Sequence, residues 1–167
     1  MPSSDLDALD RNILSALQED ARLSNVDLAE KVGLSPSPCL RRVRRLEEDG
    51  YIRGYRALLD RRKLGLGLTV YVDIKVEKHS VENAAGLQRM LEAIPEVVSA
   101  HMVSGDADFL AEVVVPDLAA YEELLTQRLL QLPMVKDIRS NFVIRPIKTD
   151  GPVSLSHLSP DEASRRT

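Results

Sequence analysis

The sequence has few of the features that mark secreted, membrane or metal-binding proteins. Its 167 residues include a single cysteine, Cys39, which excludes both an intrachain disulfide and a cysteine-rich zinc site. No stretch approaches the roughly 20 apolar residues that span a bilayer, and the first residues lack the basic and apolar segments of a signal peptide. These absences predict a protein of the reducing cytoplasm that does not associate with membranes.

Positive charge is not in excess either, because 22 lysines and arginines face 26 aspartates and glutamates, for a net charge of -4. Any nucleic-acid site must therefore be a local patch on an acidic protein. The sequence contains no nucleophile-elbow motif and no phosphate-binding glycine loop. The histidines, His79, His101 and His157, have no metal-ligand spacing. We therefore expect no enzyme activity, no metal and no cofactor.

The first 60 residues carry three short helical patterns. Apolar residues at three- and four-residue spacing predict a first helix from about Asp5 to about Glu19. A second helix is delimited by Ser24, a capping residue, and by Gly33. Serines and prolines at 35–38 begin a third helix, which Gly50 ends. Two short helices joined by a glycine turn predict a helix-turn-helix within residues 1–60.

The third helical pattern is rich in arginine, with four arginines in five consecutive positions. A helical wheel places Cys39, Leu40, Val43 and Leu46 on a packing side and Arg41, Arg44 and Arg45 opposite. Exposed arginines contact phosphates and bind guanine edges in the major groove. The alternative is a solvated face that pairs with the acidic residues 47–49, but the helix-turn-helix spacing favours DNA. The predicted DNA-binding residues are Ser35, Ser37, Pro38, Arg41, Arg42, Arg44 and Arg45.

A second domain follows a polar, glycine-containing linker at 61–67. Residues 68–148 alternate strand and helix patterns in the order βαββαβ, which predicts an α+β, ferredoxin-like fold with helices on one face of an antiparallel sheet. The uncovered face predicts a homodimer. Residues 149–167 are rich in serine, proline, aspartate and arginine, a composition that predicts a mobile tail.

To about residue 148 the chain resembles the Lrp/AsnC family of transcriptional regulators. The resemblance is carried by LDALDRNILSALQEDARLSNVDLAEKVGLSPSPCLRRVRRLEEDGYIRGYRALLD, then by VSGDADFL, VPDLAAYEELL and VKDIRSNFVI. It implies a winged-type helix-turn-helix domain that acts on double-stranded DNA, and homodimers that assemble further, often into octamers. It also implies an effector amino acid, such as leucine, bound between dimers by the C-terminal domain.

The same resemblance assigns the effector loop to Gly105, Asp106 and Asp108 within VSGDADFL. It adds as lining positions Met102, Leu118, Ser140 and Asn141. A glycine allows close approach of the backbone, and an aspartate can hold an ammonium group through charge-assisted hydrogen bonds. Without the resemblance, these residues also fit an ordinary hairpin turn, in which glycine and aspartate are common.

Two other functions fit parts of the sequence. A metabolic regulatory module would bind an amino acid through its ferredoxin-like domain and act through protein partners, but its docking helix would expose apolar or aromatic anchors rather than arginines. A non-specific architectural DNA-binding protein would carry broad positive charge, which this chain lacks. The sequence therefore predicts a sequence-specific DNA-binding transcription regulator that responds to an amino acid.

Overall fold

A computed structural model of the chain describes residues 6–77 and 81–158, which form two compact units. The helical unit comprises the described residues up to Ala57 together with those from Lys148 onward. The sheet unit comprises the described residues of Leu58–Ile147. The boundary thus falls before the predicted linker, and the helical unit draws on both ends of the chain.

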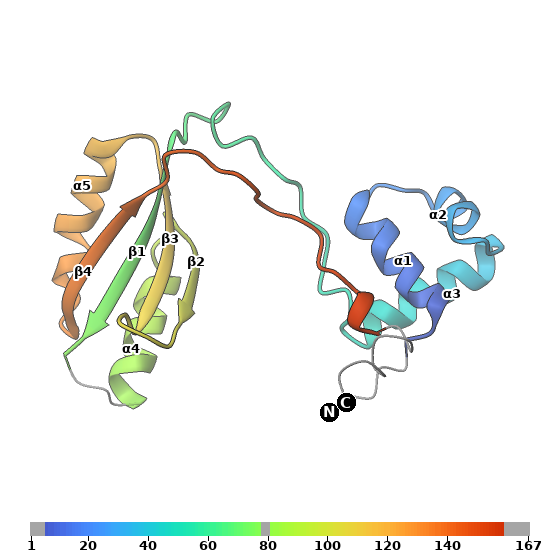
Figure 1. Cartoon of the computed structure of the whole chain (residues 1–167), viewed down its shortest axis with the longest axis horizontal. Helices are drawn as coiled ribbons and strands as arrows, with labels where there is room; N and C mark the ends of the chain where they lie inside the picture. The colour runs from blue at the N-terminus through green and yellow to red at the C-terminus, as the bar shows by residue number, and fades with distance from the viewer. Residues whose placement is uncertain (1–5, 78–80, 159–167) are drawn as a thin grey trace. The chain divides into compact units, whose positions relative to one another are not determined.

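The helical unit contains the three predicted helices in the predicted order (Figure 1). They are α1 (Ala8–Glu19), α2 (Asn25–Val32) and α3 (Pro36–Glu48). Asp7 caps α1, since its carboxylate accepts the Asp10 N–H, and Ser24 caps α2 in the same way through the Asp27 N–H. Gly33, with φ 71°, adopts the left-handed conformation that ends α2 and starts the turn into α3. These contacts confirm the predicted helix-turn-helix.

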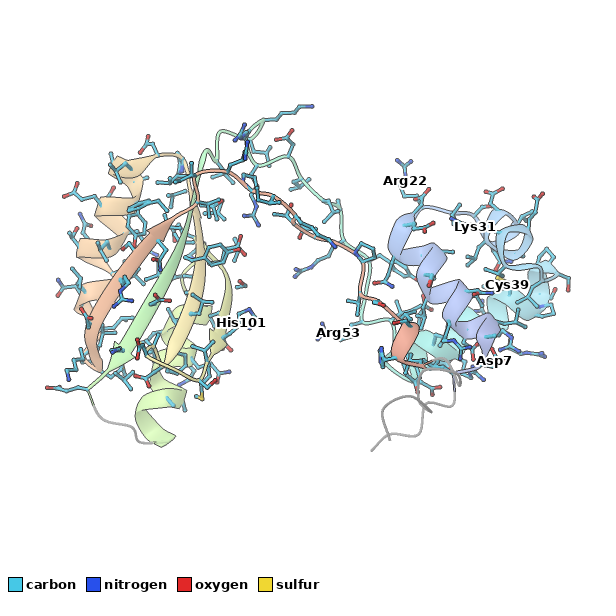
Figure 2. All side chains as sticks on the ribbon, viewed as in Figure 1. Asp7, Arg22, Lys31, Cys39, Arg53 and His101 are labelled. Atoms are coloured by element: carbon cyan, nitrogen blue, oxygen red, sulfur yellow. The ribbon has the colours of Figure 1, made fainter. Side chains whose placement is uncertain are left out.

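The apolar sides of the three helices meet in one core cluster. Its buried members are Leu6, Ile13, Ala16, Leu28, Ala29, Val32, Cys39 and Leu46. Cys39 lies among the helices with no exposed surface, and its burial raises the pKa of the thiol (Figure 2). The prediction that Cys39 is a small core residue is confirmed.

Part of the segment predicted to be a mobile tail packs against this core. Residues 149–158 belong to the helical unit and end in a short 3-10 helix, η2 (Ser156–Leu158). Leu158 packs against the core cluster, and Val153 forms hydrogen bonds with Gln18 of α1. Residues 149–158 thus make packing and hydrogen-bond contacts that the composition of the segment did not predict. Residues 159–167 lie outside the described part of the chain.

The sheet unit is the predicted βαββαβ arrangement, with a four-stranded antiparallel sheet in the order β2-β3-β1-β4 (Figure 1). Its elements are β1 (Leu68–Val76), α4 (Val81–Glu92), β2 (Val97–Met102), β3 (Phe109–Val115), α5 (Leu118–Gln127), the 3-10 helix η1 (Leu129–Gln131) and β4 (Val135–Phe142). Leu87 and Leu91 of α4 share one core with Tyr121 and Leu124 of α5 and with the inward residues of β1 and β3. Both helices therefore cover the same face, which confirms the ferredoxin-like prediction.

The other face of the sheet is left open and carries polar and apolar side chains. In β1, buried Val72 and Ile74 alternate with the more exposed Tyr71 and Asp73. Arg61, from the segment predicted as a linker, donates to Glu112 of β3 over 2.7 Å. The predicted linker 61–67 is therefore part of the sheet unit. None of the described helices is long and apolar enough to cross a membrane.

Candidate functional site

One stripe of α3 is turned away from the helical core. Cys39 and Leu46 are fully buried and define the inward direction of the helix. Ser37, Arg41 and Arg44 follow one another at helical spacing on the opposite side, and all three are exposed. Neither arginine has an ion pair or side-chain hydrogen bond within the described residues. We name Ser37, Arg41 and Arg44 the outer stripe.

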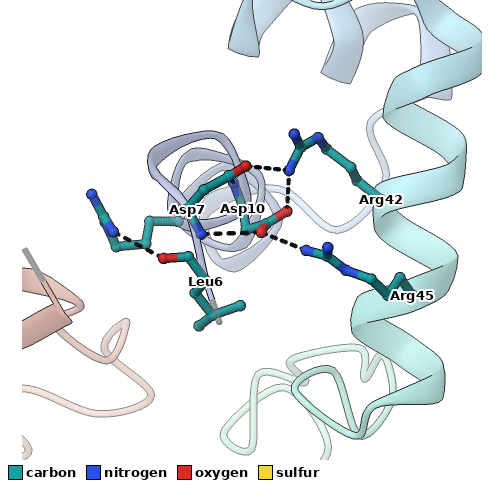
Figure 3. Close-up of polar contacts among 6 residues, drawn as sticks. Leu6, Asp7, Asp10, Arg42 and Arg45 are labelled. Atoms are coloured by element: carbon teal, nitrogen blue, oxygen red, sulfur yellow. Dashed lines mark hydrogen bonds and ion pairs between the residues drawn. The ribbon is translucent and has the colours of Figure 1, made fainter. Parts of the chain in front are cut away.

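The other two arginines of α3 are turned towards α1. Arg42 Nη1 lies 2.7 Å from Asp7 Oδ2 and 2.8 Å from Asp10 Oδ1, while Arg45 Nη2 pairs with Asp10 Oδ2 (Figure 3). Arg45 is exposed, as predicted together with Arg41 and Arg44, but it also pairs with Asp10, a contact that the helical wheel does not indicate. Arg42 and Arg45 thus join the third helix to the first.

Asp10 is the centre of this cluster and has no exposed surface. Its Oδ2 also accepts the Asp7 N–H over 3.2 Å, so both carboxylate oxygens have donors. The hydrogen bond from the Asp10 N–H, with a smaller contribution from Arg42, holds the pKa of Asp7 below its usual value. The hydrogen bonds to Asp10 and Asp7 raise the pKa of Arg42. Hydrogen bonds and two opposite charges surround the buried carboxylate of Asp10 and offset the cost of its burial, so this cluster fixes α3 against α1.

Further contacts fix the two ends of α3. At its start, Asn25 Nδ2 donates to the Pro36 carbonyl over 2.8 Å. Ser35 is the N-cap but makes no capping hydrogen bond with its side chain. At its end, Tyr55 Oη donates to Glu47 Oε1 over 2.8 Å, and burial followed by this contact raises the pKa of Tyr55 to about 12. The start of α3 thus retains a serine hydroxyl that is not used for capping.

Two residues of α3 differ in exposure from what their predicted roles require. The helical wheel predicts Leu40 on the packing side, yet 39% of its surface is exposed, next to the outer stripe. Pro38, predicted to contact DNA, is half-buried. An exposed apolar side chain beside arginines can contact the methyl group of thymine. Leu40 is therefore a candidate interface residue that the sequence pattern did not identify.

In the sheet unit, the predicted effector loop connects β2 to β3. Gly105 has φ 118°, a conformation that favours glycine, and Asp106 is exposed. Asp108 Oδ2 accepts the Val76 N–H over 2.9 Å, and the Asp108 N–H donates to the Ile74 carbonyl over 3.0 Å. Asp108 therefore ties the loop to the end of β1, whereas Asp106 projects from the surface.

An open groove of about 510 Å³ runs between α4 and the edge strand β2, beside this loop. Its lining residues are Gln88, Leu91, Glu92, Val97, Val98, Ser99, Ala100, His101, Met102 and Phe109. Met102 is the one predicted effector residue in this lining, and Met102 and Phe109 are the two residues at which the strands meet the loop. The mixed apolar and polar lining suits a small amphipathic molecule.

The remaining predicted lining residues lie elsewhere in the sheet unit. Leu118 begins α5 beyond the far end of β3, roughly 20 Å along the strand from the loop. Ser140 lies on the helix-covered face, where its Oγ is 2.5 Å from Tyr121 Oη. Asn141 lies on the open face and donates to Asp73 over 3.0 Å. One copy of the chain therefore does not bring all seven predicted effector residues into one pocket.

The described residues offer no group of three or more histidine, cysteine, aspartate or glutamate side chains that could hold a metal ion. His101 projects from β2 at an exposed position (Figure 2). His79 lies outside the described residues.

Comparison with known proteins agrees with both units. A model of winged helix-turn-helix DNA-binding domains matches residues 6–53, and the model of the Lrp/AsnC ligand binding domain matches residues 69–153. The leucine-responsive regulatory proteins of Escherichia coli K12 and Salmonella typhimurium are each 46% identical over 147 residues, which cover 88% of this chain and 90% of theirs.

Solved structures give the same result. A transcriptional regulator from Neisseria meningitidis, in complex with L-methionine, has a TM-score of 0.88 and 36% identity, covering 92% of this chain and 99% of that one. An AsnC family regulator from Agrobacterium tumefaciens has a TM-score of 0.86 and 42% identity, covering 91% and 99%. The matched family models and the curated relatives are those of transcriptional regulators rather than enzymes. With a winged helix-turn-helix DNA-binding domain and an Lrp/AsnC ligand binding domain, the chain belongs to the Lrp/AsnC family of transcriptional regulators.

Proposed function

We propose that this regulator recognises specific double-stranded DNA through the outer stripe of α3, with Ser37, Arg41 and Arg44 facing the major groove. The observation that carries the proposal is that Arg41 and Arg44 are exposed and have no partner among the described residues, whereas Arg42 and Arg45 are bound to acidic residues. Arginine binds guanine O6 and N7 in a two-point contact, and serine can donate to phosphate or base. Arg42 and Arg45 then position the helix rather than contact bases.

The effector that we propose is a small amino acid with an apolar side chain, bound at the loop 103–108 beside the groove. Relatives are named for leucine, and a structural neighbour holds L-methionine. Val98 and Met102, which line the groove and are exposed, offer apolar surface to such a side chain. Asp106, at the exposed tip of the loop, is better placed than Asp108 to hold the ammonium group, because the Asp108 carboxylate already accepts a backbone hydrogen bond.

We further propose a two-fold homodimer through the open face of the sheet, with higher assemblies such as octamers. A dimer would present two α3 helices to successive turns of the major groove, about 34 Å apart. Because Leu118 and Asn141 lie away from the loop, they would join an effector site only if a second copy contributed them. As a DNA-binding regulator with a buried thiol, the protein would act in the cytoplasm.

The experiment that tests this function is a mobility-shift assay with the purified chain and the DNA upstream of its own gene. The assay includes excess competitor DNA and adds each common amino acid in turn. We expect a specific complex whose stability or stoichiometry changes with one amino acid. A folded, oligomeric protein that forms no specific complex under any condition would instead support a metabolic module acting through protein partners.

A further inference from the structure

The segment 148–158 runs along α1 and is anchored to it at two points. Near the end of α1, Gln18 forms a two-point contact with the backbone of Val153. Gln18 Nε2 donates to the Val153 carbonyl over 3.2 Å, and the Val153 N–H donates to Gln18 Oε1 over 2.7 Å. The side-chain amide thus pairs with the returning backbone much as a neighbouring strand would.

The second anchor lies about 10 Å further back along α1, given its rise per residue. Arg11 Nη1 donates to the Leu158 carbonyl over 3.3 Å and also to the Leu6 carbonyl over 3.1 Å. The Leu158 side chain packs against the core cluster of the helical unit. The order of the contacts, Val153 at Gln18 and Leu158 at Arg11, shows that the segment runs antiparallel to α1.

On another side, α1 also holds α3 in place. Asp7, the N-cap of α1, and Asp10, in its first turn, bind Arg42 and Arg45 of α3, and Arg11 directly follows Asp10. The segment 148–158 is also the continuation of the chain after β4. The sheet unit is therefore connected to the helical unit covalently at both of its ends, at 57/58 and at 147/148.

We propose that residues 148–158 form a strap that positions α1 and, through Asp10, sets the orientation of α3 on DNA. The strap also gives the sheet unit a second covalent path to the DNA-binding helices, one that begins at β4. The effect on DNA affinity can be measured only if the proposed DNA-binding function is correct, and in this respect the inference rests on it. The contacts themselves are tested without DNA.

The test uses the full chain with Gln18→Glu and, as a matched control, Val153→Ala. Gln18→Glu preserves the shape and the acceptor for the Val153 N–H, but it places a carboxylate oxygen against the Val153 carbonyl. Val153→Ala removes only a side chain that is 70% exposed and leaves both backbone hydrogen bonds intact. The three readouts are amide hydrogen exchange in α1, the ratio of operator to competitor DNA affinity, and the salt dependence of binding. All are measured at a temperature at which every variant is folded.

For Gln18→Glu we expect faster exchange in α1 and a specificity ratio lowered by about five-fold, the effect of roughly one lost hydrogen bond. The salt dependence of binding should stay unchanged, because no phosphate contact is removed. Val153→Ala should match the unaltered chain in all three measurements. A chain that ends at Lys148 should show a larger effect in the same direction.

Two results would overturn the strap. Exchange in Gln18→Glu equal to that in Val153→Ala would show that the contact does not hold α1. Faster exchange with an unchanged specificity ratio would reduce residues 148–158 to a local stabilising contact without influence on α3. Failure of the unaltered chain to bind DNA specifically is a separate result, which refutes the proposed function even if exchange in α1 depends on Gln18.

Discussion

Asp10 and Arg42 are 32 residues apart in the sequence, yet Asp10 Oδ1 and Arg42 Nη1 lie 2.8 Å apart in the helical unit. This ion pair, shared with Arg45, joins the first turn of α1 to the middle of α3. It divides the arginines of α3 into two pairs with different roles. One pair binds buried acid within the protein, and the other is exposed on the outer stripe.

Replacing both Arg42 and Arg45 by alanine should strongly destabilise the helical unit. Asp10 would remain as a buried carboxylate with a single backbone donor, a loss that costs about 3 kcal/mol of unfolding free energy. The measurement is urea unfolding of the full chain followed by circular dichroism.

The matched control is Arg41→Ala combined with Arg44→Ala, which removes the same charge from the same helix. Because these side chains are exposed and have no partner in the described part of the chain, this change should alter the unfolding free energy by less than about 0.5 kcal/mol. Equal stability of the two double variants would contradict the assigned roles.

The low pKa of Asp7 predicts a specific loss of stability in acid. Its usual value is 3.8, and in the folded chain the pKa is lower because the carboxylate accepts the Asp10 N–H and pairs with Arg42. The ionised form therefore adds stability at pH values above 3.8, and this contribution disappears as the pH falls through the lower folded pKa.

Asp7→Asn separates the charge from the cap, because asparagine also caps helices well. Its unfolding midpoint should fall less steeply than that of the unaltered chain when the pH is lowered from about 4, the usual carboxyl range. Asp7→Ala should in addition lose about 1 kcal/mol at neutral pH through loss of the cap. Thermal unfolding across the acidic range measures both effects, and parallel curves for Asp7→Asn and the unaltered chain would count against the contact.

The two aspartates of the loop between β2 and β3 should behave differently. Asp108→Ala leaves the Val76 N–H without its acceptor, so the sheet unit should lose about 1 kcal/mol or more of unfolding free energy. Asp106→Asn changes an exposed residue and should leave stability unchanged while weakening effector binding. Calorimetric titration with L-leucine and with L-methionine, alongside urea unfolding, measures both. Effector binding that survives Asp106→Asn at full strength would place the ammonium contact elsewhere.

Much of the fold could be predicted from the sequence because the determining signals are local. Ser24 and Gly33 delimit α2 as expected, and the alternation from Leu68 to Val76 corresponds to β1. Helix caps, glycine turns and two-residue periodicity depend on neighbouring residues, so they can be read without knowledge of the fold.

The arrangement of the site could be predicted only in part, because it depends on contacts between distant residues. A helical wheel identifies the amphipathic character of α3, but it does not indicate that Asp10 attracts Arg45 away from the outer stripe. Similarly, the composition of 149–158 does not show that Gln18 offers the backbone of this segment a hydrogen-bonding partner. The neighbouring positions Ser140 and Asn141 point to opposite faces, as the alternation of any strand requires.

The most direct test of the DNA interface is the salt dependence of operator binding by Arg41→Ala combined with Arg44→Ala. As a control, Arg62→Ala combined with Arg89→Ala removes two exposed arginines from the sheet unit. The two double variants therefore have the same net charge. With the outer stripe on DNA, the first variant should lose affinity, and the slope of log K against log salt should become shallower by about 1 for each phosphate contact removed. The control should keep the slope of the unaltered chain. An unchanged affinity and slope in Arg41→Ala with Arg44→Ala would show that α3 does not contact DNA through this stripe.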